Sequence, residues 1–222
     1  QPESAVLPPI TLKRGKAILT LQRQGQFGIY GLKVLPVMQP MASPAWSTVG
    51  PFKSHWGTEV LAGRFKGDQG LKKTFSKVYP PQINSALDAT YQNAYGQTIG
   101  WKQDNGIVRG RYHDWGVDIT IRTGSPGADI AFGQCTITSD CKRTAMFYLP
   151  VDWWASAYLN GKRVRSTIDS KLSDIGYDFT THYPTFYAVL ELEKGENTLL
   201  VKQLGGSLGT RFIGYITKDD GL

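Results

Sequence analysis

Short runs of apolar or alternating residues recur roughly every ten residues from Trp46 to Ile216, and Gly, Pro, Asn or Asp separates one run from the next. Residues 187–192 alternate with the two-residue period of a half-buried strand. The dipeptide Asn160-Gly161 lies between two such runs and predicts a tight hairpin, because both turn positions need a positive φ. In a chain of 222 residues with 25 glycines and 12 prolines, this regular spacing of turn residues between short strands predicts an all-β sandwich or barrel.

The chain divides into an N-terminal segment over residues 1–40 and a main domain over residues 41–222. Prolines break the strand pattern near the boundary. The apolar runs of the first segment predict a strand pair, which a linker follows. We expect this pair to dock on the main domain, because so short a segment cannot form a core alone. Its stretch Leu12–Gln22 is similar to Leu192–Lys202, a charged turn with Gly followed by a strand. An alternative is therefore that the pair ends a preceding, similar domain.

The chain carries a formal net charge of +7 and has a pI near 9.3, which favours an acidic partner such as nucleic acid, an anionic membrane surface or an acidic polysaccharide. Its basic residues come in short groups, and no motif of a DNA- or RNA-binding domain accompanies them, so nucleic acid is not expected. No stretch reaches the roughly 18 consecutive apolar residues of a membrane span. The alternative is a solvated surface that happens to be basic.

Two cysteines, Cys135 and Cys141, have five residues between them. No histidine pattern accompanies them, so a zinc site is not expected. A short disulfide across the connection and two free buried thiols are both open interpretations. The best helix candidate is the short stretch Pro80–Tyr91. Because the chain begins at Gln1 rather than Met, we expect a mature or excised piece of a longer protein.

Three stretches carry a resemblance to a known kind of domain. Trp46–Phe52 reads Trp-x-x-x-Gly-Pro-Phe, Tyr158–Val164 contains the Asn-Gly-Lys hairpin, and Leu192–Lys202 reads as a charged turn, Gly, Asn and a strand. From Trp46 onward the chain resembles a galactose-binding-like jelly-roll domain, as found in secreted bacterial glycosidases and polysaccharide-degrading proteins. The resemblance implies a jelly-roll β-sandwich that binds polysaccharide or oligosaccharide, next to other domains of a secreted, periplasmic or cell-surface protein. It implies no cofactor and leaves a structural calcium ion open.

The densest cluster of polar and aromatic residues lies at residues 109–115. Aromatic rings stack on the apolar face of a sugar, and planar polar groups bind its hydroxyls, while a guanidinium suits a carboxylate. A second place, at residues 151–154, holds one acid and two indoles, which point to opposite faces if this stretch is a strand. The predicted carbohydrate-binding residues are Arg111, Tyr112, His113, Trp115, Asp152 and Trp154.

A non-catalytic binding domain is favoured over an enzyme. A polysaccharide lyase could use Arg111, Tyr112 and His113, but these residues are consecutive, and Tyr112 would face away from its neighbours in a strand. A glycoside hydrolase needs two placed carboxylates, and no spacing of acids singles out a pair. Motifs of nucleophilic serine, P-loop and dinucleotide sites are absent from the sequence. A purely structural accessory domain of a multidomain glycosidase is the other alternative.

Overall fold

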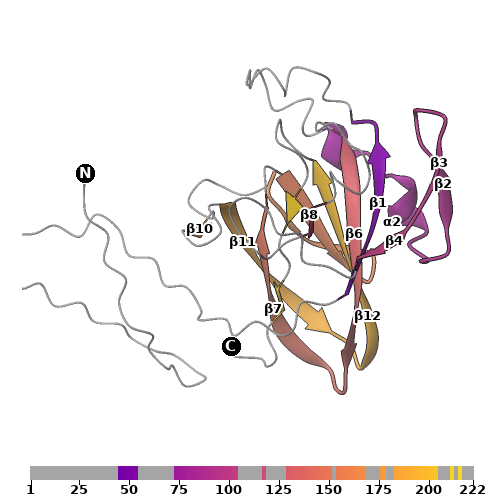
Figure 1. Ribbon diagram of the computed structural model, residues 1–222. Coiled ribbons are helices and arrows are strands. Elements are labelled where there is room, and N and C mark those ends of the chain that lie inside the picture. Colours follow the sequence, from indigo (N-terminus) through magenta and orange to yellow (C-terminus); the bar gives the residue numbers. More distant parts are fainter. Residues whose placement is uncertain are drawn as a thin grey trace, which may run out of the picture.

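The computed structural model describes residues 45–54, 73–104, 117–118, 129–151, 154–168, 176–178, 183–204, 211–212 and 215–216 (Figure 1). Its described strands form a six-stranded and a four-stranded antiparallel sheet, together with two small two-stranded sheets. The six-stranded sheet has the order β4 (Lys102–Asp104), β1 (Trp46–Phe52), β6 (Ile130–Ser139), β12 (Gly195–Leu204), β8 (Trp154–Leu159), β9 (Lys162–Ser166). The four-stranded sheet has the order β10 (Gly176–Asp178), β11 (Tyr183–Leu192), β7 (Arg143–Pro150), β14 (Tyr215–Ile216). The small sheets pair β13 (Arg211–Phe212) with β5 (Val117–Asp118), and β2 (Thr90–Gln92) with β3 (Thr98–Gly100).

The chain passes repeatedly from one large sheet to the other. It crosses from the six-stranded to the four-stranded sheet between β6 and β7, returns between β7 and β8, crosses again between β9 and β10, and returns between β11 and β12. These crossings agree with two sheets packed face to face, and the predicted all-β sandwich is confirmed. The predicted strand pair within residues 1–40 lies outside the described residues.

The Asn160-Gly161 hairpin is confirmed. These two residues join β8 to β9 with φ angles of 49° and 79°, the positive values that such a two-residue turn requires. The predicted helix over Pro80–Tyr91 is wrong beyond its first turn, because α2 covers only Pro80–Ile83 and β2 begins at Thr90. The helix ends after one turn because the backbone of Asn84 is extended. The N–H of Asn84 still makes the last helical bond, to the carbonyl of Pro80.

The six-stranded sheet is buried on both faces. Along β12, Leu199 and Val201 face an inner cluster between the two sheets, whereas Leu200 and Leu204 face an outer cluster on the opposite side. The outer cluster is covered by aromatic side chains from residues 75–101, so the sandwich carries a third layer here. Phe52 is its centre, with ring centroids 6.0 Å from Tyr79, 6.0 Å from Tyr91 and 5.7 Å from Phe132.

A buried lysine joins this third layer to the sheet. Lys202, on β12, is 0% exposed, and its Nζ donates to the carbonyls of Thr74 (2.9 Å), Phe75 (3.2 Å) and Lys77 (2.9 Å). These carbonyls lie at and just after the helical turn at residues 73–76, where the negative end of the helix dipole favours a cation. The rings of Phe75 and Tyr79 lie 5.2 Å and 4.6 Å from the same nitrogen.

The two cysteines are not bridged. Cys135 is buried in the inner cluster on β6, whereas Cys141 is exposed beyond the end of that strand, and both are free thiols. Burial raises the pKa of the Cys135 thiol. In the part of the chain that the structure describes, no helix is both long and apolar enough to cross a membrane.

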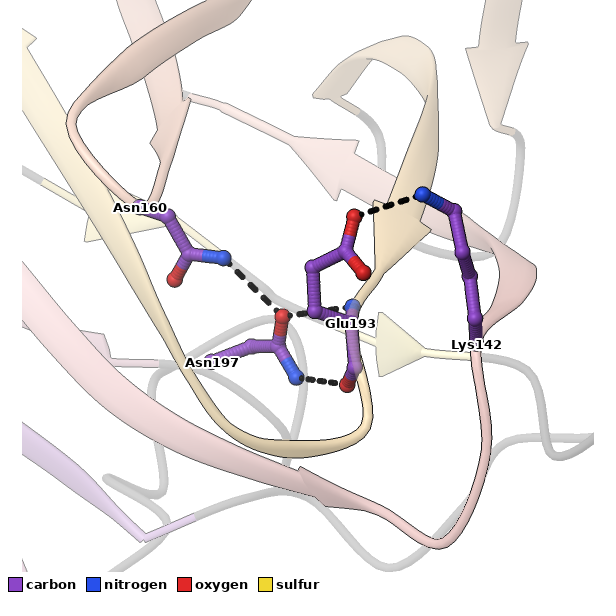
Figure 2. Close-up of polar contacts among 4 residues, drawn as sticks. All are labelled: Lys142, Asn160, Glu193 and Asn197. Carbon is purple, nitrogen blue, oxygen red and sulfur yellow. Dashed lines mark hydrogen bonds and ion pairs between the residues drawn. The ribbon is translucent and has the colours of Figure 1, made fainter.

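One asparagine ties together the turns at one end of the sandwich (Figure 2). Asn197 is 0% exposed, and its Oδ1 accepts from the main-chain N–H of Glu193 (2.9 Å) and from Nδ2 of Asn160 (3.0 Å). Its Nδ2 donates to the carbonyl of Glu193 at 2.8 Å. The ion pair of Lys142 with Glu193, at 2.8 Å, joins two exposed side chains and contributes little to stability.

We expect Asn197→Ala to lower the free energy of unfolding by about 2–3 kcal/mol, because it leaves buried polar groups of the Glu193 turn without partners. The matched control is Lys142→Ala, which breaks only the exposed ion pair and should leave stability close to that of the wild type. Chemical denaturation measures both. A cost for Asn197→Ala as small as that of the control would show that the turn does not depend on this side chain.

We expect Lys202→Met to destabilise the fold by about 3 kcal/mol, because the apolar replacement leaves the carbonyls of Thr74, Phe75 and Lys77 without their donor. The control is Lys162→Met at an exposed position of β9, which should be close to neutral. The pH dependence gives a second readout. Burial, and secondarily the charge of Lys77, lowers the pKa of Lys202 to about 7 from 10.5.

Between these two pH values the unfolded chain holds the Lys202 proton more tightly than the folded chain does. From about pH 7 to about pH 9 the free energy of unfolding of the wild type should therefore rise with pH, and the rise should be absent in Lys202→Met. Above this range the buried thiol of Cys135, whose pKa is raised, acts in the opposite direction in both proteins. Equal slopes in the two proteins would contradict the lowered pKa.

Candidate functional site

The structure describes only one of the six predicted binding residues. Arg111, Tyr112, His113, Trp115 and Asp152 lie outside the described residues, so they remain predictions. Trp154 begins β8 and is half-buried, with its side chain packed against the outer cluster. The structure therefore does not bring the predicted residues together, and the described part of the chain offers a different place to look.

That place is a groove of about 290 Å³ between β1 and the hairpin of β2 and β3. Figure 1 shows this hairpin at the outer side of β1 and β4. Gly50 brings β1 close to β6, since a Cβ at this position would lie 3.0 Å from the Cβ of Ala131. The residues that line the groove combine polar side chains with a few apolar ones: Thr48, Val49, Gly50, Pro51, Gln97, Thr98, Ile99, Gly100 and Lys102. A site for one small polar ligand has this composition.

The turn of the hairpin is held by Asn93. Its Oδ1 accepts from the main-chain N–H groups of Tyr95 (3.0 Å) and Gln97 (2.9 Å). Because Oδ1 of Asn93 accepts these two bonds, Nδ2 of Asn93 faces the side chain of Gln97. It donates to Oε1 of Gln97 at 2.9 Å. The side chain of Gln97 therefore has a fixed orientation at the wall of the groove.

The tip of the hairpin is attached to the main sheet by Tyr95. Its hydroxyl donates to the carboxylate of Asp129, 3.0 Å from Oδ1 and 2.9 Å from Oδ2, just before β6 begins. Desolvation, reinforced by Asp129, raises the pKa of Tyr95 to about 12, so the hydroxyl keeps its proton at neutral pH. Desolvation also raises the pKa of Asp129, although the bond from Tyr95 acts in the opposite direction.

The base of the hairpin is attached by a relay of hydrogen bonds. Trp101 donates from Nε1 to the hydroxyl of Tyr91 at 2.9 Å, and that hydroxyl donates to the carbonyl of Asn84 at 2.6 Å. The hairpin is thus fixed at its tip, its turn and its base by side chains. Because these contacts hold the walls of the groove in place, the groove is preorganised, and a ligand would lose little binding free energy in ordering it.

Thr48 lines the groove but is only 1% exposed, and among the described residues its Oγ1 has no hydrogen-bond partner. Thr48 pairs with Lys102 across β1 and β4, so both side chains lie on the same face of the sheet. Because its Oγ1 has almost no accessible surface, this hydroxyl is closed to a ligand in the groove.

Local turn signals for this hairpin are present in the sequence, but the prediction did not use them. Asn93 and Gly96 are turn residues between two short stretches rich in Thr, Tyr and Gln, and Gly96 has a φ of 75°. The roles of Thr48 and Lys102 depend on pairing between strands far apart in the sequence, which no local pattern shows. Within the described residues, no group of three or more His, Cys, Asp or Glu side chains could hold a metal ion.

Neither a protein-family model nor a curated protein matches this sequence. Among solved structures, the chain is similar to a family 35 carbohydrate binding module from an environmental isolate, at 11% identity over 52% of this chain and 84% of that chain, with a TM-score of 0.34. It is similar to a beta-galactosidase from Bacteroides fragilis at 13% identity, over 81% of this chain and 23% of that chain, with a TM-score of 0.32.

A third similar structure is the beta-glucosidase from Kluyveromyces marxianus in complex with glucose, at 15% identity and a TM-score of 0.33, over 40% of this chain. The chain spans only 10% and 11% of the length of the two beta-glucosidase structures of that organism. Identities and TM-scores at this level establish neither the family nor the function of this chain.

We expect Tyr95→Phe to loosen the hairpin, because it removes the bonds from the tip to Asp129, at a local cost of about 1 kcal/mol. Hydrogen exchange should become several-fold faster at the N–H groups of Asn93 and Gly96, which are bonded within the hairpin, while β6 and β12 stay protected. Asp88→Asn, at an exposed acid, is the control. Unchanged exchange in Tyr95→Phe would show that the hairpin is held without Asp129.

Proposed function

We propose that this chain is a non-catalytic carbohydrate-binding domain of a larger secreted protein that degrades glycans. The observation that carries the proposal is the preorganised groove beside β1, which combines polar side chains with the apolar surface of Pro51 and Ile99. Sugar rings require this combination, because they present hydroxyls around their edge and C–H groups on their faces. The β-sandwich provides a rigid support for such a site.

An acidic polysaccharide is the glycan that the charge of the chain favours. The formal net charge is +7, and the predicted cluster at residues 109–115 adds guanidinium and aromatic groups suited to an acidic sugar. Arg111 and Trp115 are the residues of this cluster that we propose as contacts with the glycan. Together with the groove, they would give the domain two places to contact an extended chain.

A purely structural accessory domain is the second candidate, and a separate observation favours it. Three large apolar side chains in and around α2 are exposed: Val78 (59%), Ile83 (78%) and Leu87 (53%). Apolar residues that gather in this way mark surfaces on which another domain can pack. This role predicts no affinity for any glycan.

We expect the intact chain to be retarded in gels that contain a uronic acid polymer, and the retardation to weaken as salt is raised, because an electrostatic contribution is screened. Arg111→Ala and Trp115→Ala should each reduce the retardation, whereas Arg163→Ala on β9 serves as a control of equal charge. Mobility shift and tryptophan fluorescence measure the binding. If neutral and acidic glycans alike fail to bind, the structural accessory role replaces the proposed function.

A further inference from the structure

The two faces of the four-stranded sheet carry different kinds of residue. The inner cluster includes Phe147 and Leu149 on β7, and Ala188 and Leu190 on β11. Because successive residues of a strand belong to opposite faces, the positions between these residues lie on the outer face of the sheet. Val189 occupies one of these positions and is 48% exposed, so at this row the outer face is open to solvent.

Three tyrosines occupy one row of positions on the outer face. Tyr187 of β11 pairs with Tyr148 of β7, and Tyr148 pairs in turn with Tyr215 of β14. Each of them is next in sequence to a buried residue of the inner cluster, so all three positions lie on the opposite face. Tyr183 lies four residues before Tyr187 on β11 and therefore on the same face. Since neighbouring strands are about 4.8 Å apart, the row spans roughly 10 Å, and Tyr183 lies about 13 Å from it along the strand.

The outer face of the six-stranded sheet shows what a covered face consists of in this protein. There the third layer packs on a surface that is mostly apolar and includes Val49, Phe52 and Phe132. The outer positions of the four-stranded sheet instead combine the tyrosines with polar residues such as Thr185 and Glu191. A tyrosine joins a flat apolar ring to a hydroxyl, which suits a partner that is apolar on one side and hydrated on the other. A sugar ring has this character, whereas an apolar protein layer does not.

The charge of the outer face favours one class of glycan. Among the outer positions of β7, β10, β11 and β14, the charged residues are Asp178 and Glu191, and none is basic. The basic residues that give the chain its net charge of +7 therefore lie elsewhere. A carboxylate or sulfate on a sugar would be repelled by these two acids, so the face favours a neutral glycan.

From these observations we infer that the outer face of the four-stranded sheet binds a stretch of neutral polysaccharide, with sugar rings stacked on the row of Tyr148, Tyr187 and Tyr215. This inference rests on the proposed function and extends it, because it names a second surface and a second class of glycan, apart from the cluster at residues 109–115. The four-stranded sheet and the hairpin of β2 and β3 lie on opposite sides of the six-stranded sheet (Figure 1). A glycan on this face would therefore leave the groove beside β1 unoccupied.

The test is titration calorimetry of the intact chain with cellohexaose, a neutral galactan hexasaccharide, glucose and galactose, at low and moderate salt. We expect a hexasaccharide to bind, and the single sugars to bind at least about tenfold more weakly, because one ring contacts only part of the row. Binding should not weaken as salt is raised, since no pair of opposite charges contributes to it. In protein with labelled tyrosine rings, the ring resonances of the row should shift on binding.

Tyr148→Thr and Tyr187→Thr each remove one ring of the row and keep a β-branched residue that suits a strand. Each should weaken binding of the hexasaccharide about tenfold, because a stacking contact is lost. Ile83→Thr is the matched control, since it places the same residue at a large exposed side chain of α2, beyond the six-stranded sheet. Tyrosine variants that bind as tightly as Ile83→Thr would overturn the inference, and so would single sugars that bind as tightly as the hexasaccharides.

The two proposals fail in different ways. If only a uronic acid polymer binds, or if a neutral hexasaccharide binds without shifting the ring resonances of the row, the inference is wrong and carbohydrate binding stands. If no glycan of either class binds the intact chain, both are wrong. Circular dichroism of each variant separates a loss of binding from a loss of folding, and the ring resonances of the wild type test the site without any substitution.

Discussion

The ammonium of Lys202 donates to three carbonyls at the end of a helical turn and lies between two aromatic rings, deep under the third layer of the sandwich. The sheet beneath it is central to the fold, because β12 pairs with β6 along ten residues and with β8 along six. These hydrogen bonds attach residues 74–77 to the sheet as a cover for the outer cluster. The aromatic cluster of Phe52, Tyr79 and Phe132 can then pack without exposure to water.

The groove depends on this cover. The relay from Trp101 through Tyr91 to Asn84 attaches the hairpin to the segment that includes α2, and the packing of Phe52 against Tyr79 and Tyr91 attaches both to the sheet. The wall that carries Gln97 is therefore positioned by a series of contacts that begins at Lys202. The residues of the groove lie on short elements, and the layers below determine their positions.

Local patterns in the sequence predicted the β-sandwich and its turns well. Asn160-Gly161 and the Asn197 turn depend on residues close together in the chain. No local pattern indicates that Lys202 is buried, because a lysine at the end of an apolar run is normally exposed. The third layer could not be predicted, since it joins a segment with weak periodicity to a sheet more than a hundred residues later in the chain.

The candidate site was predicted less well than the fold. The predicted cluster at residues 109–115 was chosen for its side chains alone, whereas the groove is made by a strand pair, Thr48 with Lys102, and by a hairpin that meets it in space. Among the described strands, β2 and β3 pair only with each other and share no ladder with the large sheets. Because side-chain contacts among the described residues position this hairpin beside the sheet, a different hairpin could replace it and change the surface beside β1 while the sandwich remains the same.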